Sequence, residues 1–325
     1  MHHLTFGDFR TYIPLVRIKK PFVIGPLGGG ERGTIELRRT LPWRARIFEL
    51  LRLAVIQLAQ MNPLTRAMYA QAAMILCKTP ETSRVIRGAA AAKIWQFREI
   101  GCPPTISRSN LELKSQSPRF HLLFAGRMLY WKGLHLALEA YAVARKSNSD
   151  LYLTVVGDGK DRESLQSVAR KLQLEDSVCW KRHMPQQELF RLQEGAHVFI
   201  FPSLHDSSGN VVMEALAHGL PVLCLNTGGP ATLVDGSCGY RVPVEGRNKQ
   251  EVVEDLAAQI VCWSTHREQW LALAYGAIEK AGKMTWKQTV LQAYEQIASL
   301  VSHREEMRLL REHAQEQHII EGRTT

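Results

Sequence analysis

The sequence predicts an α/β protein built on a doubly wound parallel sheet, and three observations lead to this prediction. From about residue 118 onward, short apolar runs alternate with amphipathic runs of helical period. Such alternation is typical of a parallel sheet that helices cover on both faces. The apolar runs end in turn-forming residues such as Gly126, Gly157 and Ser203. A chain of 325 residues is also long enough for two domains with separate cores.

The predicted elements follow in order along the chain. The strand-like runs of the regular part are 120–125, 151–156, 178–181, 198–201, 221–225 and 240–244. The helix-like runs between them are 133–146, 161–172, 186–194 and 211–218. Residues 250–300 are predicted to be helical, with three packing anchors, Trp263, Trp270 and Trp286. Ligands of open α/β sheets bind at the carboxyl ends of the strands, so we expect the site there.

The first 110 residues are less regular. Strand-like runs are predicted at 21–24, 73–78 and 93–97, and helical runs at 42–61 and 63–73. The polar, turn-rich stretch 107–118 is predicted to be a linker. We therefore expect domains at 1–106 and 119–300, with the charged tail 301–325 forming a helix that packs back on the first domain.

The composition is that of a globular protein, with 45% hydrophobic and 8% aromatic residues. The six cysteines are scattered without a C-x-x-C pair, which predicts free thiols in a reducing compartment. No run of about 18 apolar residues occurs, so no membrane-spanning helix is predicted. These features together predict a cytoplasmic protein.

The positive charge is concentrated in one part of the chain. Residues 1–110 hold 17 Lys and Arg against 6 Asp and Glu, a net of +11, whereas the whole chain has +10. Within this part, residues 38–52 mix basic and apolar side chains at helical spacing. Such a helix can lie on an anionic membrane surface, with Trp43, Phe48 and Leu51 inserted, or present an ordinary solvated basic face. Periodicity alone does not distinguish a membrane-binding helix from one with a solvated basic face. We expect no nucleic-acid partner.

The most informative stretch is 201–222, FPSLHDSSGNVVMEALAHGLPV. A strand-like run leads through Ser207, Ser208, Gly209 and Asn210 into a helix-like run that starts at Val211. The free N–H groups and the dipole of a helix N-terminus form an anion site, and Gly209 allows close approach. Two acids, Asp206 and Glu214, flank this turn. The arrangement suits a nucleotide-sugar, and the alternative is a plain capping motif.

The whole stretch resembles the signature of retaining GT-B glycosyltransferases of family four, with Asp206 where the family usually has Glu. A second element, Gly126-Arg127 followed by Lys132-Gly133, resembles the G-R…K-G motif of the same family. The resemblance implies four catalytic residues: Arg127 and Lys132 hold the two phosphates, Asp206 the sugar hydroxyls and Glu214 the ribose hydroxyls. It implies a GT-B-like fold, with one complete donor domain (119–300) and a partial Rossmann-like N-terminal domain that lacks its first βα units.

Further donor-binding residues follow from the same resemblance. They are Gly126, Gly157, His183, Met184, Ser207, Ser208, Gly209, Asn210, Val211, Gly28, Gly29 and Gly30. The three consecutive glycines 28–30 follow a strand-like run and can present bare backbone to a phosphate or a sugar, or form a flexible turn. No metal triad or D-x-D motif occurs, and Arg127 and Lys132 can neutralise the phosphates. We therefore expect a metal-independent enzyme without a cofactor.

The resemblance implies a hexosyltransferase of polysaccharide or glycoconjugate synthesis. The donor would be a UDP- or GDP-linked sugar, and the acceptor a glycan or a lipid-linked glycan. The basic first part would then contact the inner face of the cell membrane peripherally. The alternative is a catalytically impaired nucleotide-sugar-binding remnant, since the first part is short for a GT-B domain. A phosphorylase or epimerase has no supporting signature here, and the sugar, nucleotide, acceptor and oligomeric state stay open.

Overall fold

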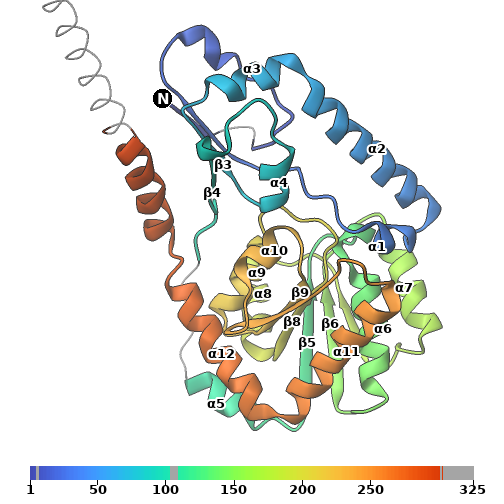
Figure 1. Ribbon diagram of the computed structural model, residues 1–325. Helices are drawn as coiled ribbons and strands as arrows, with labels where there is room; N and C mark the ends of the chain where they lie inside the picture. The colour runs from blue at the N-terminus through green and yellow to red at the C-terminus, as the bar shows by residue number, and fades with distance from the viewer. Residues whose placement is uncertain (5–6, 103–108, 301, 303–325) are drawn as a thin grey trace, which may run out of the picture.

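The computed structural model describes residues 1–4, 7–102, 109–300 and 302. This part of the chain contains two parallel sheets, a four-stranded sheet near the N-terminus and a six-stranded sheet below it (Figure 1). Each sheet has its own group of buried apolar side chains. Two parallel sheets of this kind fit two Rossmann-like domains, as predicted.

The larger sheet has the strand order β10-β9-β8-β5-β6-β7. Its strands are β5 (Phe120–Ala125), β6 (Leu151–Val156), β7 (Val178–Lys181), β8 (Val198–Phe201), β9 (Val222–Leu225) and β10 (Gly239–Val242). The chain starts in the middle with β5, winds outward to β7, returns across the sheet to β8 and winds outward in the other direction. This order confirms the doubly wound sheet and places a switch point between β5 and β8.

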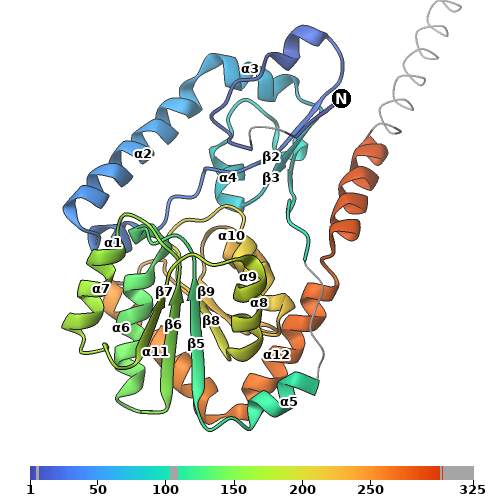
Figure 2. The same cartoon turned by 180° about the vertical axis from the view of Figure 1, so that it is seen from behind.

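Helices cover both faces of this sheet, so its central strands are buried and mostly apolar. All side chains of β5 and β8 are buried. One face carries α6 (Leu134–Arg145), α7 (Arg162–Lys171) and α11 (Lys249–Thr265), and α6 packs against α11. The opposite face, turned forward in Figure 2, carries α8 (Gln186–Gly195) and α9 (Asn210–Ala217), and α12 (Arg267–Gly282) packs against α9. Two short helices, η3 (Tyr130–Lys132) and α10 (Gly228–Leu233), lie in loops at the carboxyl ends of the strands.

The smaller sheet has the sequential order β1-β2-β3-β4. Its strands are β1 (His2–His3), β2 (Val23–Leu27), β3 (Met74–Cys77) and β4 (Ile94–Gln96). The helices of this part are η1 (Pro14–Ile18), α1 (Ile35–Arg39), α2 (Trp43–Met61), α3 (Pro63–Gln71), α4 (Pro80–Val85) and η2 (Ala91–Lys93). Pro63 and Pro80 each occupy the first helical position, and the side chains of Asn62 and Thr79 cap these helices.

Three segments differ from the sequence predictions. The expected linker 107–118 contains helix α5 (Ser109–Ser115), because Leu111 is buried in the core and anchors the helix beside α12. Leu37 and Leu41, in the expected first domain, are buried in the core of the larger sheet. Trp286 is exposed, and its helix, residues 286–300, returns to the N-terminal part, where Tyr294 meets His2 edge-on. The tail 301–325 lies outside the described residues, apart from residue 302.

Polar contacts fix the N-terminal part against the loops of the larger sheet. Glu49 of α2 accepts a hydrogen bond from His205 (2.8 Å) and forms an ion pair with Arg52 (2.9 Å). Glu81 of α4 accepts a hydrogen bond from the Gly228 N–H at the start of α10 (2.9 Å). These contacts close the two sheets around the carboxyl ends of β8 and β9.

Candidate active site

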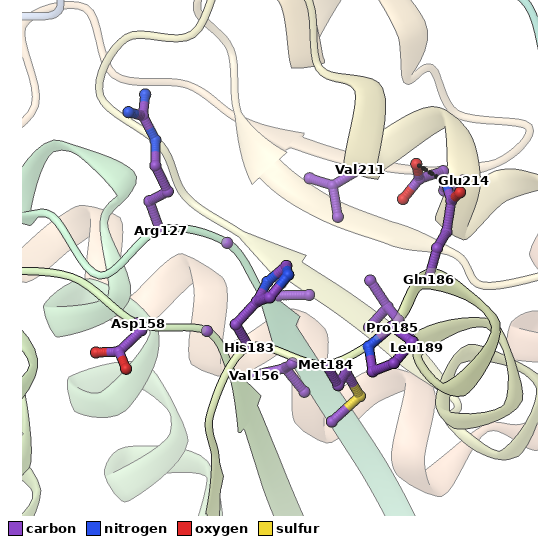
Figure 3. A pocket seen from close by; sticks show the side chains of 13 residues that line it. Arg127, Val156, Asp158, His183, Met184, Pro185, Gln186, Leu189, Val211 and Glu214 are labelled. Carbon is purple, nitrogen blue, oxygen red and sulfur yellow. Dashed lines mark hydrogen bonds between the residues drawn. The ribbon is translucent and has the colours of Figure 1, made fainter.

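A cavity of about 580 Å³ lies at the carboxyl ends of β5, β6 and β7. Figure 3 shows Arg127 at one end, Glu214 and Gln186 at the other, and His183 with Met184 between them. The cavity thus lies beside the switch point, where the fold places ligands. Its lining residues are Ala125, Gly126, Arg127, Val156, Gly157, Asp158, His183, Met184, Pro185, Gln186, Leu189, Val211 and Glu214.

Arg127 supplies a positive charge at the edge of the cavity. It lies two residues after β5, which ends at Ala125. Its side chain is exposed, and within the described part of the chain it makes no hydrogen bond or ion pair. A free guanidinium at this place can bind two phosphate oxygens as a fork.

Glu214 supplies a carboxylate at the opposite end. It lies on α9, and its Oε1 accepts a hydrogen bond from Gln186 Nε2 at the start of α8 (3.0 Å). Burial raises the pKa of Glu214 above its usual value, and the hydrogen bond from Gln186 offsets only part of this effect. Gln186 was not predicted as a site residue, although its position after the His183-Met184-Pro185 loop is a signal that could have identified it.

Lys132 and Asp206 form an ion pair in the loops that precede α6 and α9. Asp206 Oδ1 also accepts the backbone N–H groups of Ser208 (3.2 Å) and Gly209 (3.1 Å). Burial alone would raise the pKa of Asp206, but the charge of Lys132 and these hydrogen bonds outweigh it and hold the pKa below its usual value. Asp206 thus accepts hydrogen bonds from the Ser208 and Gly209 N–H groups, which the sequence analysis assigned to donor binding.

The structure divides the predicted site residues into groups. The cavity brings together Gly126, Arg127, Gly157, His183, Met184, Val211 and Glu214. Lys132, Asp206, Ser208 and Gly209 are joined by hydrogen bonds but do not line it. Asn210 lines a smaller neighbouring cavity together with Gln186 and Glu214.

The glycine run of the N-terminal part does not present free N–H groups. The N–H of Gly28 donates to Gly7 O (2.7 Å), that of Gly29 to Glu31 Oε2 (3.1 Å) and that of Gly30 to Thr82 Oγ1 (3.2 Å). The buried Glu31 carboxylate organises this turn, since Thr79 and Thr82 also donate to it. Gly28 nevertheless lies close to the loop that contains Ser207. A Cβ atom added at position 28 would be only 2.8 Å from the Cβ of Ser207.

One N-terminal residue that the sequence analysis did not identify reaches the same loop. Glu99 accepts a hydrogen bond from Ser208 Oγ (2.5 Å) and forms an ion pair with Lys78 (2.5 Å). Glu99 and Ser208 are 109 residues apart, so no local pattern signals their contact.

The described residues contain no group of three or more His, Cys, Asp or Glu side chains arranged to hold a metal ion. None of the helices that the structure describes is long and apolar enough to cross a bilayer. Metal independence stays a prediction.

The family model of the glycosyl transferases group 1 matches residues 108–271, half of the chain. The chain therefore belongs to this glycosyltransferase family. Among curated relatives, it is 29% identical over 191 residues to D-inositol 3-phosphate glycosyltransferase of Corynebacterium urealyticum. The match covers 56% of this chain and 44% of that protein. It is 32% identical over 119 residues to glycogen synthase of Mycobacterium tuberculosis, which covers 36% of this chain and 29% of that protein. The chain spans less than half the length of these relatives.

Solved structures share the fold. HepE of Anabaena, in complex with UDP, has a TM-score of 0.63 at 17% identity, covering 87% of this chain and 74% of that one. WaaG, a glycosyltransferase of lipopolysaccharide biosynthesis, has a TM-score of 0.54 at 18% identity, covering 86% and 80%. The pneumococcal O-GlcNAc transferase GtfA, in complex with UDP and GlcNAc, has a TM-score of 0.58 at 18% identity, covering 74% and 48%. At these identities the likeness establishes the GT-B-like fold.

Proposed function

We propose that this protein is a retaining glycosyltransferase that moves a hexose from a nucleoside-diphosphate sugar to a glycan or lipid-linked acceptor. The observation that carries the proposal is the cavity at the switch point, with an exposed Arg127 at one end and a half-buried Glu214 at the other. Solved proteins of the same fold that bind UDP support a UDP-linked donor.

Each end of the cavity has a role in this proposal. Arg127 binds the diphosphate and neutralises the charge that develops on it as the glycosidic bond breaks. Glu214 accepts hydrogen bonds from the ribose hydroxyls, and His183 and Met184 flank the base. Lys132 joins the diphosphate site when the donor competes with Asp206 for its charge, which frees Asp206 for the sugar hydroxyls and the Ser208–Val211 backbone for donor oxygens.

Calorimetry and a transfer assay test the proposal together. The purified chain is titrated with UDP and with GDP in the presence of EDTA, and then assayed for release of UDP from UDP-glucose with and without acceptors. Binding with turnover in EDTA supports a metal-independent enzyme. Binding without turnover supports the impaired remnant, and the absence of nucleotide binding contradicts both.

Donor affinity should fall in mildly acidic solution because of Glu214. A group with a raised pKa takes up a proton at higher pH than an ordinary glutamic acid, which titrates at about 4.3. As the pH falls through this raised pKa, the carboxylate loses its charge and accepts hydrogen bonds less well, so the Kd of UDP-glucose should rise. Calorimetry from pH 8 to 5 measures this. Glu214→Gln should bind more weakly at pH 8 and lose the pH dependence, and an unchanged profile in this variant would contradict the role of Glu214.

The outer face of α2 supports peripheral contact with an anionic membrane. An apolar stripe follows helical steps along it and is exposed, reaching 72% at Met61: Trp43, Ile47, Leu50, Leu51, Ala54, Leu58 and Met61. Arg44 and Arg46 flank the stripe, and Arg38 and Arg39 precede it in α1. An apolar stripe bordered by cations matches the chemistry of an anionic bilayer surface. Phe48 differs from the prediction, because it stacks on Trp131 instead of pointing outward with the stripe.

A charge inside this stripe should weaken binding to lipid. Leu58→Glu removes an apolar contact and adds repulsion, so its affinity for vesicles of phosphatidylglycerol and phosphatidylcholine should fall about tenfold. The matched control is Gln71→Glu, which adds the same charge at an exposed position at the end of α3, outside the stripe. Co-sedimentation measures both variants. Equal binding of Leu58→Glu and the unmodified chain would remove α2 as the contact.

A further inference from the structure

A second cavity, of about 460 Å³, lies on the other side of two loops that also wall the donor cavity. The loop after β5 contributes Arg127 to the donor cavity and Trp131 to the second one, and the loop after β6 contributes Asp158 and Lys160 in the same way. The start of α2 closes the second cavity from the N-terminal part, and Figure 1 shows this end of α2 above α7. The two cavities are therefore neighbours across shared loops.

Aromatic rings dominate the walls of this cavity. Phe48 and Trp131 stack across the two parts of the chain, with ring centroids 5.6 Å apart and planes 12° apart. The His205 ring also stacks on Trp131, with ring centroids 5.7 Å apart. Trp43 takes no part in this stack and is 66% exposed, so its ring is a platform with room for a ligand.

Two cations of the cavity have no acidic partner. The Lys160 ammonium lies 5.5 Å from the Phe48 ring centroid and 5.6 Å from that of Trp131, and the Arg44 guanidinium lies 5.2 Å from that of Trp43. Neither side chain makes an ion pair within the described part of the chain. Asp161 is the one acidic residue of the lining, and its carboxylate accepts the Tyr130 backbone N–H (3.0 Å). The lining thus carries a net charge of +1, from Arg44 and Lys160 against Asp161.

The geometry points to an acceptor subsite that binds a saccharide carrying an anionic group, and this inference rests on the proposed glycosyltransferase function. A sugar ring presents C–H groups on its faces, which pack on aromatic rings, and hydroxyls on its rim, which suit Ser164 and Asp161. The unpaired cations select a carboxylate or a phosphate on the sugar. The volume lies within the range of about 300–1,000 Å³ for small-molecule sites, which also favour domain junctions.

Saccharide binding in lipid-free solution tests this inference. Tetragalacturonate, an anionic oligosaccharide, is compared with neutral maltotetraose by calorimetry. We expect tetragalacturonate to bind at least tenfold more tightly, and Lys160→Ala to remove this preference. Trp43→Ala should weaken binding about tenfold, which corresponds to about 1.4 kcal/mol, and Trp43→Phe should restore most of it. Gln57→Ala, an exposed position on the same helix, is the control. UDP affinity should be the same in all variants.

The subsite is wrong if tetragalacturonate does not bind, or if it binds to Trp43→Ala as tightly as to the unmodified chain. UDP binding would in that case still support the donor site. If Trp43→Ala loses affinity only for anionic vesicles, this end of α2 serves the membrane and the subsite is again wrong. If saccharide binds as expected but UDP does not, the proposed function fails, and the cavity is a saccharide site without the acceptor role.

Discussion

Replacement of Arg127 by alanine should lower kcat for sugar transfer by about 10²- to 10³-fold, the loss typical when a group that stabilises transition-state charge is removed. The guanidinium lies free at the edge of the donor cavity, and it makes no intramolecular hydrogen bond or ion pair in the part of the chain that the structure describes. The folded state therefore loses little, and the thermal unfolding midpoint should stay unchanged. Initial rates with UDP-glucose and thermal denaturation measure the two effects.

Two variants give this experiment its controls. Arg170→Ala removes an exposed cation from the end of α7 and should leave kcat unchanged. Arg127→Lys keeps the charge but loses the fork, so it should recover part of the activity. Full turnover by Arg127→Ala would show that the leaving diphosphate is neutralised elsewhere, and the assignment of the cavity would fail.

Replacement of Lys132 by methionine should destabilise the protein by roughly 3 kcal/mol at pH 7, the lower end of the loss when one partner of a buried ion pair is removed. The two side chains are only 14% and 15% exposed, so the variant leaves the Asp206 carboxylate largely buried without its cation. Turnover should fall as well. Urea denaturation at several pH values measures the change in the free energy of unfolding.

The pH dependence of this loss follows from the lowered pKa of Asp206. A carboxyl group with a folded-state pKa below its unfolded value contributes stability above the unfolded pKa, which is about 3.9. That contribution disappears as the pH falls through the folded pKa, so the difference between the two proteins should shrink below about pH 4. Lys283→Met, which breaks an exposed pair with Glu279, is the matched control and should cost at most about 1 kcal/mol. Equal stability of Lys132→Met and the unmodified protein would show that the pair contributes nothing to folding.

The sequence by itself determined the larger sheet and predicted where the candidate site lies. Its strands are short apolar runs between amphipathic helices. A strand that is buried on both faces needs apolar residues on both, so such a run predicts it without knowledge of its neighbours. The strand-turn-helix stretch around Asp206 and Glu214 and the motif at Arg127 were likewise visible, because their chemistry depends on residues close together in the chain. The structure placed Arg127 and Glu214 on one cavity, as the order of the parallel strands requires.

Only the tertiary structure decided how these elements are used. Lys132 pairs with Asp206, 74 residues away, and Ser208 with Glu99, 109 residues away. The glycine run 28–30 looked free in the sequence, but Glu31 and Thr82 occupy two of its N–H groups once the turn is packed. The cavity at Trp43, Trp131 and Lys160 forms only where α2 meets the loops of the larger sheet. Burial raises the pKa of Glu214, and Lys132 lowers that of Asp206; both effects depend on residues that are distant in the sequence. Local sequence fixes the period and chemistry of a segment, whereas its partners depend on how the folded chain brings distant segments together.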